Sequence, residues 1–335
     1  MSRVMLDSRM PIGGAGRYAR DLIAGLAELD GTFEYKVLGS SGAGTAAFTP
    51  WGRRSVAREA RRWPADLIHG LHFELPRSKL PKVVTIQDLI PVEFPDSMPS
   101  PSRRRVFRKI LELSLARASC VIVPSDATAS AVIRFGGRAA NIRVIPLGVS
   151  DAFAPLQPGR ADEVRSRVSG GRHYVAAIYH PKAHKNLGPL IAASCMWRSD
   201  LDLVLAGGGE LPRQRRMHAL TDVDDSALRD LYGAATLVVI PSLVEGFGLP
   251  ALEALATGTP VIAGPGLASA RYLAGAVQMC DVTDPASIAA AVDALSHDKD
   301  RLNAMTSDGA SAVADLTIEK MATLTSQVYR ELLGA

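Results

Sequence analysis

Residues 236–264, TLVVIPSLVEGFGLPALEALATGTPVIAG, constrain the fold more than any other part of the chain. The apolar run Leu237–Ile240 is rich in β-branched residues and too short for an ordinary helix, which predicts a buried parallel strand. A polar loop with two glycines follows, and Pro250 suits the first position of a helix that Gly258 ends. Val261–Ala263 predicts a second strand. This order is typical of an open α/β sheet, which binds ligands at the carboxyl ends of its strands.

Two carboxylates and a set of backbone amides fall within this stretch. Glu245 lies in the loop and Glu253 in the helix, and between them Phe247, Gly248 and Leu249 offer N–H groups near a helix N-terminus. Such a terminus binds anions. A diphosphate on the amides, with sugar and ribose hydroxyls on the carboxylates, would suit a nucleotide sugar. Taken singly, each glutamate also has a plainer interpretation, as a solvated side chain or a partner of the helix dipole.

The whole stretch resembles the signature PSxxEGFGLPxLEAxAxGxPVI of the retaining glycosyltransferases of family 4. Glu245 and Glu253 have the family's spacing, and the other matching residues are Pro241, Ser242, Gly246, Phe247, Gly248, Leu249, Pro250, Ala254, Gly258, Pro260 and Val261. The resemblance implies the α/β GT-B fold, in which two Rossmann-like domains with parallel sheets face each other across a cleft. It implies an acceptor-binding domain over residues 1–150, joined by a C-terminal helix at 317–335 that crosses back to it. A nucleotide-sugar-binding domain over 151–316 completes the expectation.

Length and composition agree with this expectation. A chain of 335 residues with 47% hydrophobic residues predicts two globular domains. No apolar run approaches the roughly 20 residues of a membrane span, and the chain opens on a strand, so we expect a cytoplasmic protein. Cys120, Cys195 and Cys280 form neither a metal pattern nor an obvious disulfide set. A net charge of +4 suits an anionic substrate but is too small and diffuse to predict nucleic-acid binding.

A glycine-rich loop precedes the first predicted helix. Residues 11–18, PIGGAGRY, predict a loop whose glycines let the backbone approach a phosphate or a sugar, followed by a helix to about residue 29. The family has a similar GGxGRY sequence. The resemblance implies that Gly13, Gly14 and Gly16 border the donor phosphates.

Several polar residues follow the next predicted strands. Asp66, His69, Gly70, Leu75 and Pro76 fit the family's DxxHG…LP stretch, which implies that His69 and His72 line the acceptor side; a core histidine bonded to backbone is the alternative for His69. The family usually has His-Asp-Leu where this chain has Gln87, Asp88 and Leu89. The resemblance places Gln87 near the transferred sugar and Asp88 near the acceptor. Gln87 can hydrogen-bond but cannot titrate, so we expect no acid–base role there.

A basic helix is predicted over residues 103–117, after an irregular proline-rich loop at 91–101. Its start carries a run of cations, Arg103, Arg104, Arg105, Arg108 and Lys109. Cations at a helix N-terminus oppose the dipole, which suggests an anionic partner, such as a weak peripheral contact with the inner face of a membrane. A solvated basic face is the plainer interpretation, and the same holds for residues 53–62.

The second domain repeats the alternation of strands and helices after a linker at 146–158. In the family, Arg-Lys-Asn holds the donor diphosphate, and here His184 precedes Lys185 and Asn186. Lys185 can bind phosphate, whereas His184 supplies charge only when protonated. The resemblance adds donor contacts from Gly207, in a glycine turn at 207–210, and from Val223 and Leu228 at the nucleobase. Relatives often have Glu where this chain has Arg271, whose guanidinium could itself contact the donor. Residues 222–224 spell an acidic triplet that we interpret as a helix cap. Helices are expected at 287–302 and 318–333.

The resemblance implies a retaining, metal-independent hexosyltransferase of glycoconjugate biosynthesis that needs no cofactor. A nucleotide-diphosphate sugar would be the donor, and a glycan, lipid-linked or small-molecule hydroxyl the acceptor. Lys185, Glu245 and Gln87 would act at the reacting centre, and the departing phosphate would take the acceptor's proton. Two alternatives stay open: a non-catalytic homologue that binds a nucleotide sugar or a partner transferase, and an epimerase or phosphorylase. The non-catalytic alternative is motivated by three departures from the family pattern, at Gln87, His184 and Arg271. In the opposite interpretation the enzyme is active, and Arg271 supplies the guanidinium group that position 184 lacks.

Overall fold

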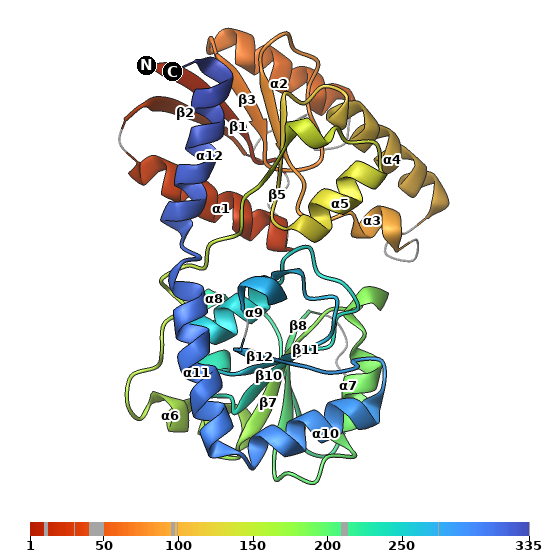
Figure 1. Ribbon diagram of the computed structural model, residues 1–335, viewed down its shortest axis with the longest axis vertical. Coiled ribbons are helices and arrows are strands. Elements are labelled where there is room, and N and C mark those ends of the chain that lie inside the picture. The colour runs from red at the N-terminus through yellow and green to blue at the C-terminus, as the bar shows by residue number, and fades with distance from the viewer. Residues whose placement is uncertain are drawn as a thin grey trace. The chain divides into compact units, whose positions relative to one another are not determined.

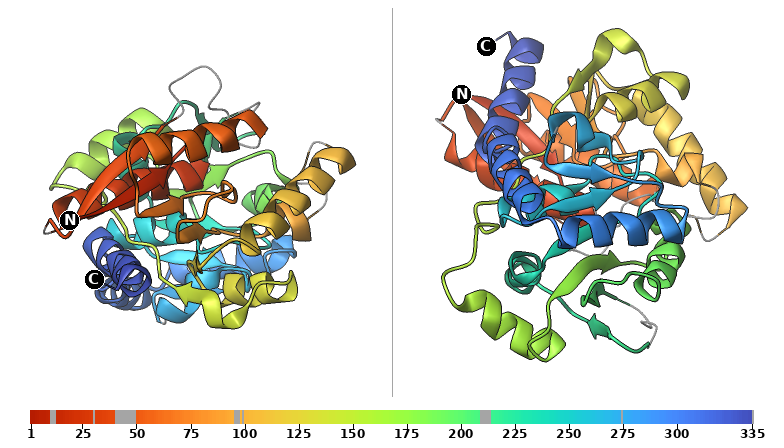
Figure 2. Two further views of the ribbon diagram at one scale, coloured as in Figure 1. Left: turned by 90° about the horizontal axis from the view of Figure 1, so that it is seen from above. Right: turned by 60° about the horizontal axis from the view of Figure 1, so that its bottom comes forward.

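The computed structural model describes residues 1–9, 13–29, 31–39, 50–94, 98, 100–208, 214–273 and 275–334, without the side chains of residues 50 and 51. The chain forms two compact units: unit 1 is Met1–Gly148 with Leu316–Ala335, and unit 2 is Val149–Asp315. Each unit contains a six-stranded sheet whose strand pairs are all parallel (Figures 1 and 2). The predicted α/β class with two Rossmann-like sheets is confirmed. Residues 11–12 of the expected glycine-rich loop and the part of the glycine turn beyond residue 208 lie outside the described residues.

Unit 1 has the strand order β2-β1-β3-β4-β5-β6. Its elements are β1 (Ser2–Asp7), α1 (Gly13–Glu28), β2 (Phe33–Leu38), α2 (Pro50–Arg62), β3 (Leu67–Gly70), β4 (Lys82–Thr85), α3 (Ile90–Glu93), α4 (Pro101–Leu115), β5 (Cys120–Val123), α5 (Asp126–Arg134), the short 3₁₀ helix η2 (Ala139–Asn141), β6 (Ile142–Val144) and α12 (Ile318–Leu333). The central strands β3, β4 and β5 are buried along their whole length, as expected for a sheet covered on both faces.

The C-terminal helix α12 packs along α1, as the GT-B expectation requires (Figure 1). Gly25 makes this close packing possible, because a Cβ at that position would lie 2.8 Å from Cγ2 of Ile318. Tyr329 of α12 is buried, and its hydroxyl lies 2.6 Å from Nδ1 of His69 in β3. Nε2 of His69 lies 2.8 Å from Oγ1 of Thr85 in β4. The last helix of the chain is therefore part of the core of unit 1.

Unit 2 has the strand order β12-β11-β10-β7-β8-β9. Its elements are α6 (Arg160–Ser169), β7 (Tyr174–Tyr179), η3 (Ala183–Lys185), α7 (Leu187–Ser194), β8 (Asp202–Gly207), β9 (Met217–Leu220), α8 (Asp225–Ala234), β10 (Leu237–Ile240), α9 (Leu249–Ala256), β11 (Val261–Ala263), η4 (Ala268–Tyr272), β12 (Val277–Met279), α10 (Pro285–Ser296) and α11 (Lys299–Ala314). The predicted strand–loop–helix–strand unit is confirmed as β10, α9 and β11.

Three local predictions were wrong, and one strand was missed. The expected glycine loop is already helical, because α1 begins at Gly13, whose φ of 62° lies in the left-handed region. The expected irregular stretch at 91–101 starts within the short helix α3. The expected helix at 287–302 is two helices, because the Asp298 side chain caps a new one by accepting from the Arg301 amide. Strand β9 was not expected at all.

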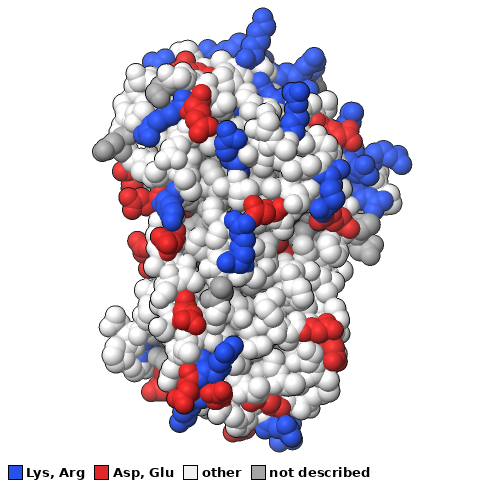
Figure 3. Space-filling model, in the orientation of Figure 1, with Lys and Arg blue, Asp and Glu red and all other residues white. Residues whose placement is uncertain are grey.

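The two units differ in charge. Unit 1 contains 24 Lys and Arg against 15 Asp and Glu, a formal charge of +9; unit 2 contains 14 against 19, a charge of −5, and the two add to the +4 of the chain. On the face drawn in Figure 3, basic side chains outnumber acidic ones on unit 1, whereas both signs mix on unit 2. No helix among the described residues is long and apolar enough to pass through a bilayer.

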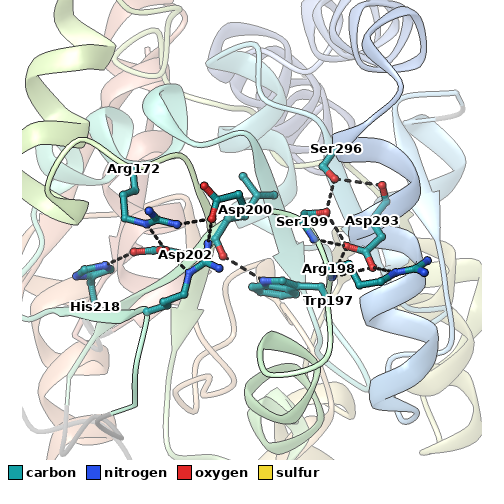
Figure 4. Close-up of polar contacts among 11 residues, drawn as sticks. Arg172, Trp197, Arg198, Ser199, Asp200, Asp202, His218, Asp293 and Ser296 are labelled. Atoms are coloured by element: carbon teal, nitrogen blue, oxygen red, sulfur yellow. Dashed lines mark hydrogen bonds and ion pairs between the residues drawn. The ribbon is translucent and has the colours of Figure 1, made fainter.

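Charged side chains join the amino ends of three neighbouring strands of unit 2. Asp202, at the start of β8, accepts hydrogen bonds from Nε of Arg172 (2.8 Å), Nε of Arg216 (2.9 Å) and Nε2 of His218 (2.7 Å; Figure 4). Arg172 precedes β7, and His218 lies in β9. This cluster therefore fixes the edge strand β9 to the sheet.

Candidate functional site

Three loops meet at the carboxyl edge of the unit 2 sheet. They follow β7, β10 and β11, and backbone hydrogen bonds join them: the Leu243 amide donates to the His184 carbonyl (2.8 Å), and the Glu245 amide donates to the Gly266 carbonyl (2.9 Å). The Ser269 amide donates to the Phe247 carbonyl at 3.0 Å. The signature loop is thus held between its two neighbours at the edge where open α/β sheets bind ligands.

Two glycines allow the loops to approach this closely. A Cβ at Gly266 would collide with the Leu243 carbonyl, and a Cβ at Gly248 would collide with Leu267. Gly248, with φ of 102°, is also the N-cap residue of α9 and contributes no side-chain hydrogen bond to its first turn. Within the first turn, Pro250 has no N–H and the Ala251 amide donates to the Gly248 carbonyl at 2.9 Å. Anion binding by the amides of Phe247, Gly248 and Leu249 therefore stays a prediction.

Lys185 and Glu245 form an ion pair beside this helix terminus. Nζ of Lys185 lies 2.6 Å from Oε1 of Glu245, and the two side chains are 22% and 11% exposed. Sequence reasoning gave both residues roles at the reacting centre, and the fold brings them together. Nδ2 of Asn186 donates to the carbonyls of Pro241 (3.1 Å) and Val282 (2.9 Å). The side-chain amide nitrogen of Asn186 thus holds the loops together beside Lys185, and the expected donor contact of Asn186 stays a prediction.

His184 is a buried residue, 3% exposed. Burial, and next the charge of Lys185, lowers the pKa of His184 to about 4, so the ring is neutral at pH 7. It does not replace the charge of the arginine found in relatives. Glu253 is almost fully buried in the second turn of α9, at 1% exposure.

The remaining predicted donor contacts surround this loop set. Gly207 ends β8, where a Cβ would collide with the Tyr179 carbonyl. Val223 is half-buried, Leu228 is buried in α8, and the expected cap is confirmed because Asp224 accepts from the Ala227 amide at 2.8 Å.

Arg271 is exposed at the end of η4. Its guanidinium lies 4.5 Å from the centre of the Tyr272 ring, and Nη2 donates to the Tyr272 hydroxyl at 2.6 Å. The Tyr272 ring lies 5.7 Å from that of Phe247 in the signature loop. Arg271 thus belongs to the same loop set, and its contact with a donor stays a prediction.

Of the acceptor residues predicted in unit 1, His69 is a core residue. It is 0% exposed, both ring nitrogens are engaged by Tyr329 and Thr85, and burial lowers its pKa to about 3. Its predicted place on the acceptor side is therefore wrong, and its partners are side chains, whereas the alternative interpretation expected backbone.

The other predicted residues of unit 1 lie near the carboxyl edge of its sheet. Gln87 is half-buried after β4, and Nε2 has no hydrogen-bond partner among the described residues. Asp88 accepts from the amide of Ile90, the first residue of α3, at 3.0 Å. A Cβ at Gly13 or Gly14 would meet open space, so the start of α1 can be approached closely. Gly16 lies in its first turns.

Sequence reasoning missed a buried charge cluster at the end of β1. Arg9 pairs with Asp7 (2.7 Å) and with Glu74 (3.1 Å), and His72 lies 3.3 Å from Asp7. Burial raises the pKa of Asp7, but hydrogen bonds from His72 and Arg9 outweigh it and hold the pKa at about 2. The sequence signal that could have indicated this cluster is the pair Asp7 and Arg9, two residues apart at the end of β1.

Comparisons with known proteins agree with this arrangement. The family described as Glycosyltransferase Family 4 matches residues 12–153, and the family described as Glycosyl transferases group 1 matches residues 173–311. The O-antigen chain mannosyltransferase B of Escherichia coli is 27% identical over 83% of this chain and 78% of its own length. A D-inositol 3-phosphate glycosyltransferase of Acidothermus cellulolyticus is 28% identical over 73% of this chain and 58% of its own length.

Solved structures share the fold. The sucrose-phosphate synthase of Thermosynechococcus elongatus has a TM-score of 0.81 at 20% identity, with both chains covered completely. HepE of Anabaena, solved in complex with UDP-glucose, has a TM-score of 0.78 at 18% identity over 99% of this chain and all of its own. WaaG, a glycosyltransferase involved in lipopolysaccharide biosynthesis, has a TM-score of 0.76 at 14% identity over 98% of this chain and 99% of its own.

Proposed function

We propose, on the premise that this chain belongs to glycosyltransferase family 4, that it transfers a sugar from a nucleoside diphosphate sugar to a hydroxyl group with retention at the anomeric carbon. The observation that carries the proposal is the pair of Lys185 and Glu245 at 2.6 Å beside the N-terminus of α9. A cation and a helix terminus suit a diphosphate, and a carboxylate next to them suits the hydroxyls of the attached sugar.

In this proposal, unit 2 binds the donor. Lys185 and the amides of Phe247, Gly248 and Leu249 hold the diphosphate and stabilise the negative charge that grows on it as the bond to the anomeric carbon breaks. Glu253 accepts from ribose hydroxyls, and Glu245 accepts from sugar hydroxyls and stabilises the positive charge on the sugar. These protein groups supply the charge stabilisation without a metal ion or another cofactor.

Unit 1 binds the acceptor. The acceptor oxygen forms the new bond on the face from which the diphosphate leaves, and the acceptor proton passes to the departing phosphate, so the products are a glycoside and a nucleoside diphosphate. The amide of Gln87 can donate to a sugar or acceptor oxygen, because Nε2 has no partner among the described residues. Gln87 is thereby a hydrogen-bonding residue without an acid–base role.

The relatives support a hexose donor and an acceptor that is a growing glycan or a small phosphorylated polyol, since their names include an O-antigen chain mannosyltransferase and a D-inositol 3-phosphate glycosyltransferase. A cytoplasmic location fits nucleotide sugars. A weak contact of residues 103–109 of α4 with an anionic membrane surface fits the charge of unit 1 and the exposure of Arg103, Arg105, Val106, Arg108 and Lys109.

One specific observation favours a second candidate, a non-catalytic nucleotide-sugar binder: His184 is neutral where relatives have an arginine. Release of nucleoside diphosphate on adding an acceptor distinguishes the two candidates. A binder gives a thermal shift with nucleotide sugars but no release.

Lys185→Ala tests the donor site directly. Thermal shifts with a panel of nucleoside diphosphates first identify the nucleotide. We then expect Lys185→Ala to weaken its binding by about 2–5 kcal/mol in calorimetry, because a partly buried charge pair is broken and Glu245 is left to repel the diphosphate. Lys182→Ala, three residues away and exposed, is the matched control and should bind normally. Unchanged affinity in Lys185→Ala, with the fold intact by circular dichroism, would remove the proposed donor site.

A further inference from the structure

Cations gather around the segment that connects β3 to β4 in unit 1. Residues 71–81 form no helix, and two guanidinium groups are held along this segment. Nη1 of Arg53, from α2, lies 3.1 Å from Oε1 of Glu74, and Nη1 of Arg117, after α4, donates to the Leu75 carbonyl at 3.4 Å. Arg77 follows two residues later and is exposed. Three arginines from separate parts of the chain thus meet at residues 74–77.

The Glu74 carboxylate does not balance the positive charge of Arg53, Arg77 and Arg117. Glu74 is shared, because its other oxygen lies 3.1 Å from Nη2 of Arg9. Burial, followed by the charges of Arg77 and Arg53, lowers the pKa of Arg117. Lys82, whose Nζ donates to the carbonyls of Ser78 and Leu80, is a further cation near Arg117. Like charges held together in this way repel one another, and a bound anion would offset that repulsion.

We propose that Arg53, Arg77 and Arg117 form a binding site for a phosphate group on unit 1. Planar guanidinium groups offer paired N–H donors that match phosphate oxygens, so two or three of them can surround one phosphate monoester or diester. The site lies in a different unit from Lys185 and the N-terminus of α9, and it stands whether or not the donor site is assigned correctly. A soluble phosphorylated molecule and a lipid headgroup share this chemistry.

Inorganic phosphate and lipid vesicles serve as the two probes. Calorimetry with phosphate is done with the donor site saturated by the nucleoside diphosphate that gives the largest thermal shift. We expect the wild-type protein to bind phosphate with a Kd on the order of 1 mM, about −4 kcal/mol, and Arg77→Gln/Arg117→Gln to bind at least tenfold more weakly. Arg62→Gln/Arg138→Gln removes the same charge from exposed positions of unit 1 and should bind as the wild type does.

Co-sedimentation with phosphatidylglycerol vesicles, against phosphatidylcholine vesicles, distinguishes the sources. Sedimentation that Arg77→Gln/Arg117→Gln loses and the control keeps assigns a lipid headgroup; phosphate binding without such sedimentation assigns a soluble ligand. If Arg117→Gln unfolds, Arg77→Gln alone is used, since Arg77 is exposed. Equal phosphate affinity in wild type and variant, or equal weakening in the control, would overturn the site.

Discussion

Glu245 and Glu253 have the same chemistry but different surroundings. Glu245 pairs with Lys185, whereas Glu253 is 1% exposed within α9. We expect Glu245→Gln to keep nucleotide affinity, because Lys185 stays available to the diphosphate, and to lower turnover by about 10²–10³-fold through lost charge stabilisation. Glu253→Gln should weaken nucleotide and donor about equally. Calorimetry with the nucleotide and steady-state turnover measure both effects; equal loss of nucleotide affinity in the two variants would contradict the assigned roles.

Spacing within one loop made part of the site predictable. Glu245, Glu253 and the start of α9 follow from a local pattern, because strand, loop and helix are consecutive in the sequence. The pairing of Lys185 with Glu245 was not predictable, since it depends on how the loops after β7 and β10 meet. The core position of His69 likewise depends on Tyr329, which lies 260 residues away along the chain.

At the scale of elements, the Asp202 cluster predicts how β9 is held. Burial raises the pKa of Asp202, but hydrogen bonds from Arg172, His218 and Arg216 leave it lowered. We expect Asp202→Asn to lower the free energy of unfolding at pH 7 by about 1–3 kcal/mol, because two partly exposed arginines lose hydrogen bonds to a charged partner. Urea unfolding measures the loss, and hydrogen exchange of the β9 amides locates it.

Asp200→Asn is the matched control for this cluster. Asp200 binds the same Arg172 and Arg216 but its side chain is 82% exposed, against 2% for Asp202, so we expect a loss below about 1 kcal/mol. The contribution of Asp202 is present above its unfolded pKa of about 4 and is lost as pH falls through the lower folded value. The difference between wild type and Asp202→Asn should therefore shrink below about pH 4; a constant difference would contradict the electrostatic cause.

Strong periodicity made most elements predictable, and tertiary contacts explain the exceptions. Met217–Leu220 is four residues long and mostly half-exposed, so no apolar run marks β9. The break between α10 and α11 depends on a single cap at Asp298, and no Gly or Pro marks it in the sequence. The α3 turn at Ile90–Glu93 is equally short and proline-containing.

At the scale of the whole molecule, the chain ends by completing the core of the unit in which it began. We expect Tyr329→Phe to lower the free energy of unfolding by about 1–3 kcal/mol, because Nδ1 of the buried His69 loses its partner. Gln327→Ala, on the exposed face of α12, should be neutral. Nucleotide binding by unit 2 should be unchanged in Tyr329→Phe; a variant that loses nucleotide affinity but not stability would contradict a purely structural role.

The Asp202 cluster and the Lys185 loop set lie at opposite edges of the unit 2 sheet, the first at the amino ends of its strands and the second at the carboxyl ends. The charged residues that hold β9 to the unit 2 sheet therefore do not constrain the sequence of the loops at the opposite edge. Substitutions in the loop after β11 can therefore accumulate while the Asp202 cluster is unchanged. A combinatorial library confined to Ala268, Ala270, Arg271 and Tyr272, which leaves out the buried Ser269 beside Gly248, should thus contain many folded members with altered sugar preference.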